Sequence, residues 1–324
     1  MTAAGSPALS VTVIMFTSRA ALLRCLDALD RQVESPDFEI LVPCDDAIHD
    51  IAALRPRCPR VTFLPLAGRR TPAELRSLAA ARASGRIVAF LEDHCMPDAD
   101  WCARIVAAHA GSHAVIGGAV EKGFAPGRST DGALDWAVYL ADYSRYMNPL
   151  PEGPAHGLTD CNVTYKRAVL QDIADAWSAE FHENVVHDRL RAAGHTLWFD
   201  PRIIVREYRP LTMRDVLRDR YAFGRLFAST RVAGAPLVRR LVLAAASLLM
   251  PPVLTLRAIR NLSSRGRHRE QIVRCTPALL FVTSVWMFGE LIGYLTGTAG
   301  ALRPRTAGSA VTDATATAVR STRG

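Results

Sequence analysis

The sequence predicts an α/β protein: a mostly parallel sheet flanked by helices, followed by a C-terminal pair of apolar, membrane-associated helices. Two observations predict this architecture. From Ser10 onward, short runs rich in β-branched residues alternate with segments whose apolar residues recur at helical spacing, which is the pattern of βαβ units. After Arg239 the chain changes to two long apolar stretches, 241–256 and 277–295, each near the roughly 20 residues that span hydrocarbon.

The predicted elements alternate along the N-terminal part of the chain. Strands are expected at 11–16, 38–42, 61–64, 87–91 and 115–120, and helices at 20–32 and 71–83, the second closed by Gly85 as a C-cap. The run 87–91 is wholly apolar, as in strands covered on both faces. Ligands of such sheets bind beyond the carboxyl ends of the strands, so the acidic residues that follow two of these runs are expected on one rim.

A long excursion follows the fifth predicted strand. Residues 123–157 are rich in Gly, Pro and aromatic residues, and a loop of that length is usually functional or mobile. A helix at 184–193, ended by Gly194, and strands at 197–199 and 203–205 come next. The predicted domains are a flexible N-terminus (1–9), an α/β domain (10–231), a membrane-associated helical region (232–299) and a disordered tail (300–324).

Composition and charge limit the classes of function. With 49% hydrophobic and 22% charged residues, the chain fits a folded protein and not a disordered one. The net charge of +8 and the arginines among the apolar stretches point to membrane lipids and not to nucleic acid. The seven cysteines have no regular spacing, so reduced thiols are expected. No signal-peptide pattern opens the sequence, so the α/β domain is expected in the cytoplasm.

Glu92-Asp93-His94, at the end of a buried strand, is the main candidate for chemistry. Acidic residues at such a place can hold Mg²⁺ or Mn²⁺ against a diphosphate, because both ions prefer oxygen ligands and Mn²⁺ also accepts imidazole. Taken alone, the tripeptide fits a capped turn with solvated charge equally well.

The segment around this tripeptide resembles family 2 glycosyltransferases of the membrane-associated bacterial type. The family pattern is Arg-Asn, then Ala-x-Gly, then an apolar strand into Asp-x-Asp, then Pro and Trp. It is matched here by Arg76-Ser77, Ala83-Ser84-Gly85, residues 87–94, Pro97 and Trp101. The resemblance extends over residues 10–231. It implies the GT-A fold, a nucleotide-diphosphate sugar donor, and inverting transfer to a hydroxyl acceptor that is lipid-linked or a growing surface glycan.

The resemblance also implies roles for single residues. The nucleotide sugar is expected to contact Thr17, Arg19, Asp45, Asp46, Arg76, Glu92 and Asp93, with Arg220 or Arg225 as a further charged contact. The acceptor side is expected at Asp160, Asn162 and Trp101, and Glu183 is the implied general base. A Mn²⁺ or Mg²⁺ ion is implied at Asp93, His94 and Glu207. His94 stands where the family has the second Asp, and Glu207 where it often has a His.

Two alternatives stay open from the sequence. One is a catalytically inactive GT-A domain that serves as a membrane-bound scaffold, and the other is a GT-A-type nucleotidyltransferase. The apolar helices are expected at the cytoplasmic face of the inner membrane. The basic loop 257–274 between them would normally stay cytoplasmic, and Pro251-Pro252 and Glu290 weaken deep insertion. These features favour helices that lie in the interface with their arginines on anionic headgroups.

Overall fold

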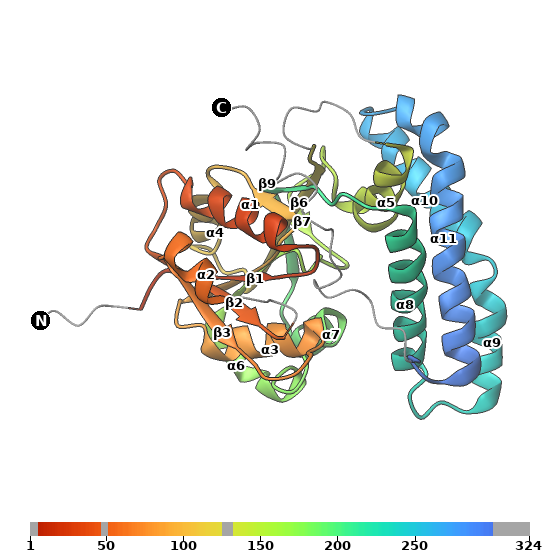
Figure 1. The fold of residues 1–324 in the computed structure, drawn as a ribbon, viewed down its shortest axis with the longest axis horizontal. Helices are drawn as coiled ribbons and strands as arrows, with labels where there is room; N and C mark the ends of the chain where they lie inside the picture. Colours follow the sequence, from red (N-terminus) through yellow and green to blue (C-terminus); the bar gives the residue numbers. More distant parts are fainter. Residues whose placement is uncertain (1–5, 47–50, 125–131, 301–324) are drawn as a thin grey trace, which may run out of the picture.

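The structure is a computed structural model that describes residues 6–46, 51–124 and 132–300. Most of the predicted flexible N-terminus and almost all of the predicted tail lie outside these residues. The described chain forms two layers (Figure 1): a sheet with its covering helices, and a group of long helices packed beside it. The predicted α/β architecture is confirmed.

The sheet has nine strands in the order β3-β2-β1-β4-β8-β6-β9-β5, with β7 paired to β9. Its strands are β1 (Leu9–Ile14), β2 (Phe38–Cys44), β3 (Val61–Pro65), β4 (Ile87–Glu92), β5 (Cys95–Pro97), β6 (Val115–Lys122), β7 (Gly153–Pro154), β8 (Asn162–Lys166) and β9 (Leu197–Glu207). Strands β1 to β4 are parallel, as predicted. The other half is mixed, because β8 runs antiparallel to both β4 and β6.

The helices around the sheet follow the expected periodicity. They are α1 (Arg19–Asp30), α2 (Ile51–Leu54), α3 (Pro72–Arg82), α4 (Trp101–Ala108), α5 (Ala133–Tyr143), α6 (Arg167–Asp172) and α7 (Glu183–Ala192). Local hydrogen bonds fix where they begin: the Ser18 hydroxyl accepts from the Ala21 amide, and Thr71 and Glu74 form a capping box at α3. The excursion 123–157, predicted as a loop, contains α5 in its described part.

Two glycine predictions have different outcomes. Gly194 follows α7 with φ +87°, as a helix-ending glycine does. Gly85 was predicted as the C-cap of the preceding helix, but α3 ends with Ala83 as its cap. A Cβ at Gly85 would lie 2.6 Å from the Ser10 backbone nitrogen, so the glycine allows close approach to β1. The two predicted strands 197–199 and 203–205 are one strand, β9.

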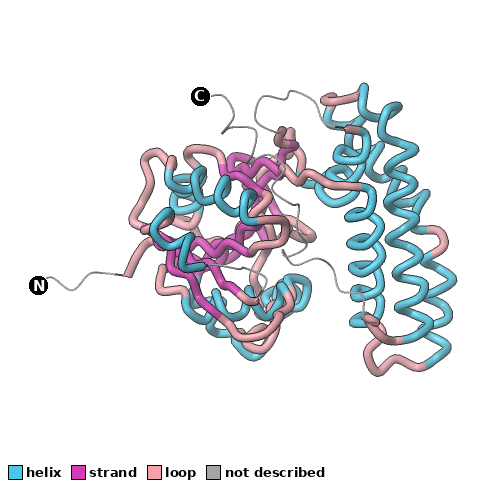
Figure 2. The backbone as a smooth tube through the Cα atoms, in the orientation of Figure 1, coloured by secondary structure: helices cyan, strands magenta, loops and turns pink. Residues whose placement is uncertain are grey.

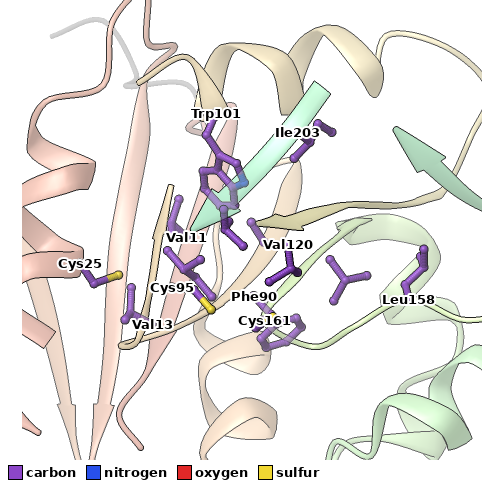
Figure 3. Close-up of a cluster of buried hydrophobic side chains, with 14 of the residues drawn as sticks. Val11, Val13, Cys25, Phe90, Cys95, Trp101, Val120, Leu158, Cys161 and Ile203 are labelled. Carbon is purple, nitrogen blue, oxygen red and sulfur yellow. The ribbon is translucent and has the colours of Figure 1, made fainter. Parts of the chain in front are cut away.

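The main core lies within the α/β layer (Figure 3), where apolar side chains from strands far apart in sequence meet. Phe90 of β4 and Trp101 of α4 are fully buried there. The Trp101 indole donates to Asn162 (3.0 Å), whose amide in turn donates to the carbonyls of Ala119 and Ile203. The core therefore includes a satisfied polar link across β8, β6 and β9.

The second layer consists of α8 (Met213–Arg231), α9 (Leu237–Ser247), α10 (Met250–Arg265) and α11 (Glu270–Thr296), the long helices beside the sheet in Figure 2. The predicted apolar stretch 241–256 is divided between α9 and α10, which are bent by 52°. Helices α8 and α11 pack closely through glycines: a Cβ at Gly289 would lie 2.2 Å from the Tyr221 carbonyl oxygen, and one at Gly224 2.3 Å from that of Trp286.

The turn between α10 and α11 is fixed to the α/β layer. Arg265 donates to the Pro149 carbonyl (2.9 Å), and Arg267 lies 3.1 Å from the Glu121 carboxylate. These two arginines of the basic loop, predicted to face lipid headgroups, therefore contact protein. Among the described helices, α11 is long and apolar enough to cross a membrane, and the bent α9–α10 pair is a second candidate if it is counted as one span.

Candidate active site

The candidate active site is a cavity of about 570 Å³ between the carboxyl end of β4, helices α3, α5 and α7, and the second layer. Arg76 of α3 lies on its wall with its side chain only 8% exposed. The Arg76 guanidinium is 2.6 Å from Glu92 and 2.5 Å from Asp160. The structure thus brings together three predicted site residues that are far apart in sequence.

Glu183 lies on the same wall, at the first position of α7. Its Oε2 is buried without a hydrogen-bond partner among the described residues. Burial, and then the negative charge of Asp160, raises the pKa of Glu183 well above its ordinary value. A carboxylate with an open oxygen and a raised pKa, facing a cavity, is suited to accept a proton.

The charged form of Glu92 is also disfavoured by its surroundings. Burial and the nearby Asp160 raise the pKa of Glu92 to about 7, although His94 and Arg76 act in the opposite direction. Three carboxylates, Glu92, Asp160 and Glu183, therefore lie close together on the cavity wall beside Arg76, with Arg145 and Arg209 also lining the cavity. Further positive charge brought by a ligand would relieve their repulsion.

Asp93 and His94 point unused atoms toward each other. Asp93 Oδ2 accepts from the backbone amides of Thr17 (2.8 Å) and Ser18 (3.0 Å), which ties the β4 end to the β1 loop. Asp93 Oδ1 and His94 Nδ1 are 3.5 Å apart, and neither has a hydrogen-bond partner among the described residues. Burial opposes protonation of His94, but the Asp93 and Glu92 carboxylates outweigh it and raise its pKa.

This pair of atoms fits part of a divalent-ion site. One carboxylate oxygen and one imidazole nitrogen are suitable ligands for Mn²⁺, and Mg²⁺ accepts the first. Within the described ranges no group of three or more His, Cys, Asp or Glu side chains could hold a metal by itself. An ion at Asp93 and His94 would therefore take its other ligands from substrate phosphates and water, as is common for Mg²⁺.

Glu207, the third predicted metal ligand, lies elsewhere. Its buried carboxylate is 3.2 Å from the Lys122 ammonium and 3.9 Å from Arg209, and it does not line the cavity. A carboxylate already facing two cations is a poor ligand for a third. The structure therefore places two of the three predicted ligands, Asp93 and His94, side by side and Glu207 apart from them; of the three, only His94 lines the cavity, and Asp93 is fully buried beside it.

Some of the residues predicted to bind the nucleotide line the cavity, and others lie outside it near the carboxyl ends of β1 and β2. Asp45 accepts from the Arg70 amide and Asp46 from the Gly68 amide, so both hold the loop before α3. Arg19 is exposed at the start of α1. None of these three lines the cavity, but they lie at the carboxyl ends of β1 and β2, beside the Asp93 contact to Thr17.

Three other predicted residues are not brought to the reaction centre. Arg225 donates from α8 to the Thr298 carbonyl and does not line the cavity. Trp101 and Asn162, predicted on the acceptor side, are buried and hydrogen-bonded to each other. Neither side chain lines the cavity. Because both are fully buried, they belong to the core.

The sequence interpretation missed the cavity residues contributed by α5, whereas Arg220, one of the two arginines predicted as a charged contact, lines the cavity. Asp142 of α5 accepts from Arg220 at two points, both 2.6 Å, and from Arg209 at 3.2 Å. The Tyr143 hydroxyl is 3.3 Å from His94 Nε2. Apolar and aromatic residues at helical spacing in 133–143 were the signal for this helix, and they were obscured by the Gly- and Pro-rich flanks.

Comparisons with known proteins agree with this geometry. The family model described as "Glycosyl transferase family 2" matches residues 10–174, half of the chain. No curated protein matches the chain. Among solved structures, the mannosyltransferase PcManGT from Pyrobaculum calidifontis, in complex with GDP-Man and Mn²⁺, is 16% identical with a TM-score of 0.51, over 91% of this chain and 86% of that chain.

Two further solved structures have lower scores. S. aureus TarS 1–349 is 15% identical, with a TM-score of 0.44, over 90% of this chain and 92% of that chain. GalNAc-T7 with UDP, GalNAc and Mn²⁺ is 15% identical, with a TM-score of 0.47, over 64% of this chain and 45% of that chain. At such identities the mannosyltransferase likeness shows the fold alone, which is GT-A. With the family match, the chain belongs to glycosyl transferase family 2, the enzymes that transfer sugars.

Proposed function

We propose that the protein is an inverting glycosyltransferase that moves a sugar from a nucleotide-diphosphate sugar to a hydroxyl of a membrane-borne acceptor. The observation that carries this proposal is the position of Glu183, whose unpaired oxygen lies on the cavity wall next to the Arg76–Glu92–Asp160 cluster. In this role Glu183 is the general base, as the family resemblance implies.

The proposed reaction is a single displacement. The acceptor oxygen forms a bond to the anomeric carbon while the bond from that carbon to the diphosphate oxygen breaks. The diphosphate leaves with the electron pair, and the hydroxyl proton goes to Glu183. Attack opposite the leaving group inverts the anomeric configuration. Arg76 keeps Glu92 and Asp160 in place, and its charge lowers the cost of bringing an anionic donor beside carboxylates.

A divalent cation is part of the proposal. Asp93 and His94 would hold Mn²⁺ or Mg²⁺, and a bound ion offsets the charge that develops on the departing diphosphate. The backbone amides of Thr17 and Ser18 keep the Asp93 carboxylate oriented. The mannosyltransferase with the same fold is complexed with GDP-Man and Mn²⁺, which supports both the donor class and the ion.

The far part of the cavity supports a lipid-linked acceptor over a free sugar. Beyond the carboxylate cluster the wall includes apolar side chains of the second layer: Phe223 and Phe227 of α8, Met250 and Leu254 of α10, and Val282 and Trp286 of α11. The same helices also contribute charged side chains to the wall: Asp219, Arg220, Arg231, Arg257 and Glu290. An acceptor with an apolar chain beside its hydroxyl-bearing group matches such a wall. A growing surface glycan on a lipid carrier fits equally, and the enzyme would then act at the cytoplasmic face of the inner membrane.

The test is release of nucleoside diphosphate by the full chain from a panel of UDP-, GDP- and dTDP-sugars, with and without Mn²⁺. We expect Mn²⁺-dependent release from at least one donor, accompanied by transfer when a lipid extract is added. Nucleotide binding in a thermal-shift assay without turnover of any donor would instead support the inactive scaffold. Release of pyrophosphate from a nucleoside triphosphate and a sugar phosphate would identify a nucleotidyltransferase.

A further inference from the structure

The bent helix pair α9–α10, at the outer side of the second layer in Figure 1, carries exposed apolar side chains along its length. The members of this apolar stripe are 49% to 72% exposed: Leu237, Val238, Leu241, Val242, Leu248, Leu249, Val253 and Leu256. They recur at helical spacing on both sides of the 52° bend, and Leu248 and Leu249 lie at the bend itself. A surface of this length on one helix pair is an interaction site.

The charge of the same segment indicates the chemistry of its partner. Residues 232–269 contain seven arginines and no acidic residue. Three of these arginines are used within the protein: Arg265 and Arg267 hold the α/β layer, and Arg240 donates to the Tyr294 carbonyl. No ion pair among the described residues involves the other four, which are Arg239, Arg257, Arg260 and Arg269; of these, Arg257 also lines the cavity. Apolar side chains flanked by unpaired arginines fit an anionic lipid surface.

The packing of α11 against α8 indicates whether these helices cross the membrane or lie on it. Helix α11 is apolar enough to span, but its Gly289 and Gly293 are in close contact with the backbone of α8 at Tyr221 and Arg225. Helix α8 carries seven charged side chains: Arg214, Asp215, Arg218, Asp219, Arg220, Arg225 and Arg231. An α11 that spanned the bilayer would carry this charged neighbour into hydrocarbon, which is strongly unfavourable.

Helix α10 links the stripe to the reaction centre. Leu249, Val253 and Leu256 belong to the exposed stripe. Met250, Leu254 and Ala258, each one or two positions further along, line the cavity. Because consecutive helical positions are rotated by about 100°, the two sets occupy adjacent faces of one helix. A surface that contacts the stripe therefore adjoins the cavity wall.

We propose that α9–α10 is a monotopic docking element, which rests its apolar stripe in the interface of an anionic lipid surface without crossing it. The neighbouring face of α10 then presents the cavity to that surface, so that an acceptor enters from the lipid side. Delivery of the acceptor rests on the proposed function, whereas docking on lipid does not.

The test is sedimentation of the full chain with phosphatidylcholine vesicles that contain or lack phosphatidylglycerol. We expect binding at least about tenfold tighter to the anionic vesicles, weakened by salt near about 1 M. The double variants Leu248→Glu/Leu249→Glu and Arg239→Glu/Arg260→Glu should each lose about tenfold in affinity. Matched controls on the α/β layer are Val33→Glu, at an apolar residue that is 51% exposed, and Arg57→Glu, at an exposed arginine. Both should bind as the wild type does.

Three results would overturn the proposal. If both double variants bind anionic vesicles with wild-type affinity, neither the stripe nor its arginines contact the lipid. Bound protein that resists alkaline carbonate extraction would show a spanning helix. A lipid-free dimer that becomes monomeric in Leu248→Glu/Leu249→Glu, together with no vesicle binding, would make the stripe an interface between copies.

The same variants separate this inference from the proposed function. Vesicle binding needs no turnover, so a chain that docks but releases no nucleotide contradicts only the proposed function. Because the stripe lies outside the cavity wall, Leu248→Glu/Leu249→Glu should hydrolyse the soluble donor as the wild type does while losing transfer to a vesicle-borne acceptor. Full transfer by this variant would contradict the docking role alone.

Discussion

The Arg76 guanidinium lies 2.6 Å from the Glu92 carboxylate and so joins α3 to the end of β4. The same nitrogen is 2.5 Å from Asp160, just before β8. Arg76 thus compensates two carboxylates of the cavity wall, whereas the nearby Glu183 keeps an oxygen without a hydrogen-bond partner among the described residues. This difference separates the residue that can take a proton from those that are held in place.

Arg76→Met should destabilise the fold and weaken donor binding. It removes the partner of two carboxylates, of which Glu92 is almost fully buried, and breaking a buried ion pair on one side costs about 3–5 kcal/mol. Urea unfolding of the two proteins measures this loss. Arg82→Met is the control, because Arg82 is exposed on the same helix. An equal effect of both changes would refute the assigned role.

Glu183→Gln should slow transfer by about 10²- to 10⁴-fold and leave donor binding intact. The amide keeps the size of the side chain but cannot accept the hydroxyl proton, and general-base catalysis contributes about 10²- to 10⁴-fold. Turnover and nucleotide affinity are measured side by side. Asp188→Asn is a suitable control, since Asp188 lies on the same helix but pairs with Arg191 at the surface. Unchanged turnover in Glu183→Gln would remove Glu183 from the mechanism.

The pH profile should rise with a midpoint well above 4.5. Burial and Asp160 raise the pKa of Glu183, and the base acts only when ionised, so kcat/KM should fall as the pH is lowered through that raised value. The residual activity of Glu183→Gln should lack this acidic limb. A flat profile in the wild type would contradict the assignment.

The free energy of unfolding should fall as the pH rises, whereas the activity should rise. A carboxyl group whose pKa is higher in the folded state stabilises the fold at low pH and loses that contribution as the pH rises through the folded-state pKa. For Glu92, whose pKa is about 7 against an ordinary 4.5, the loss should occur between those values. Urea midpoints measured across this range without donor should decline, and the decline should be smaller in Glu92→Gln.

The choice of ion should depend on His94. Imidazole is a ligand that Mn²⁺ accepts more readily than Mg²⁺, whereas a carboxylate suits both. We expect chelation to stop wild-type turnover and Mn²⁺ to restore it better than Mg²⁺. His94→Asp should raise the ratio of Mg²⁺- to Mn²⁺-supported turnover, and His182→Asp, at an exposed position, should not. Full activity in the presence of a chelator would exclude the ion from the reaction.

Gly289→Ala should loosen the second layer. Alanine favours a helix by about 1 kcal/mol over glycine, but here its Cβ would lie 2.2 Å from the Tyr221 carbonyl oxygen. Forcing α8 and α11 apart should cost about 1–3 kcal/mol, measured as a lower unfolding midpoint. Gly157→Ala is the matched control, because nothing lies within 4 Å of a Cβ there. A stabilised Gly289→Ala protein would contradict the close packing.

Local pattern was sufficient for the first half of the sheet and for much of the reaction centre. The β-branched runs of β1, β2 and β4 and the helical spacing of α1 predict parallel βαβ units, because each signal lies within a few residues. The family spacing around Glu92-Asp93-His94 placed Arg76 and Glu183 at one site, and the structure brings both to the cavity. Helix α5 was missed because its flanks are typical of loops.

The sequence by itself determined which segments are strands or helices and which residue types can hold a donor and accept a proton. Only the tertiary structure decided the antiparallel direction of β8, the pairing of Asp142 with Arg220, and the faces of α10 that meet the cavity and the surface. It also decided the ion pair between Glu207 and Lys122 and the hydrogen bond between Trp101 and Asn162. The physical reason is that strand direction, ion-pair choice and helix orientation are fixed by contacts between distant segments, which local periodicity does not encode.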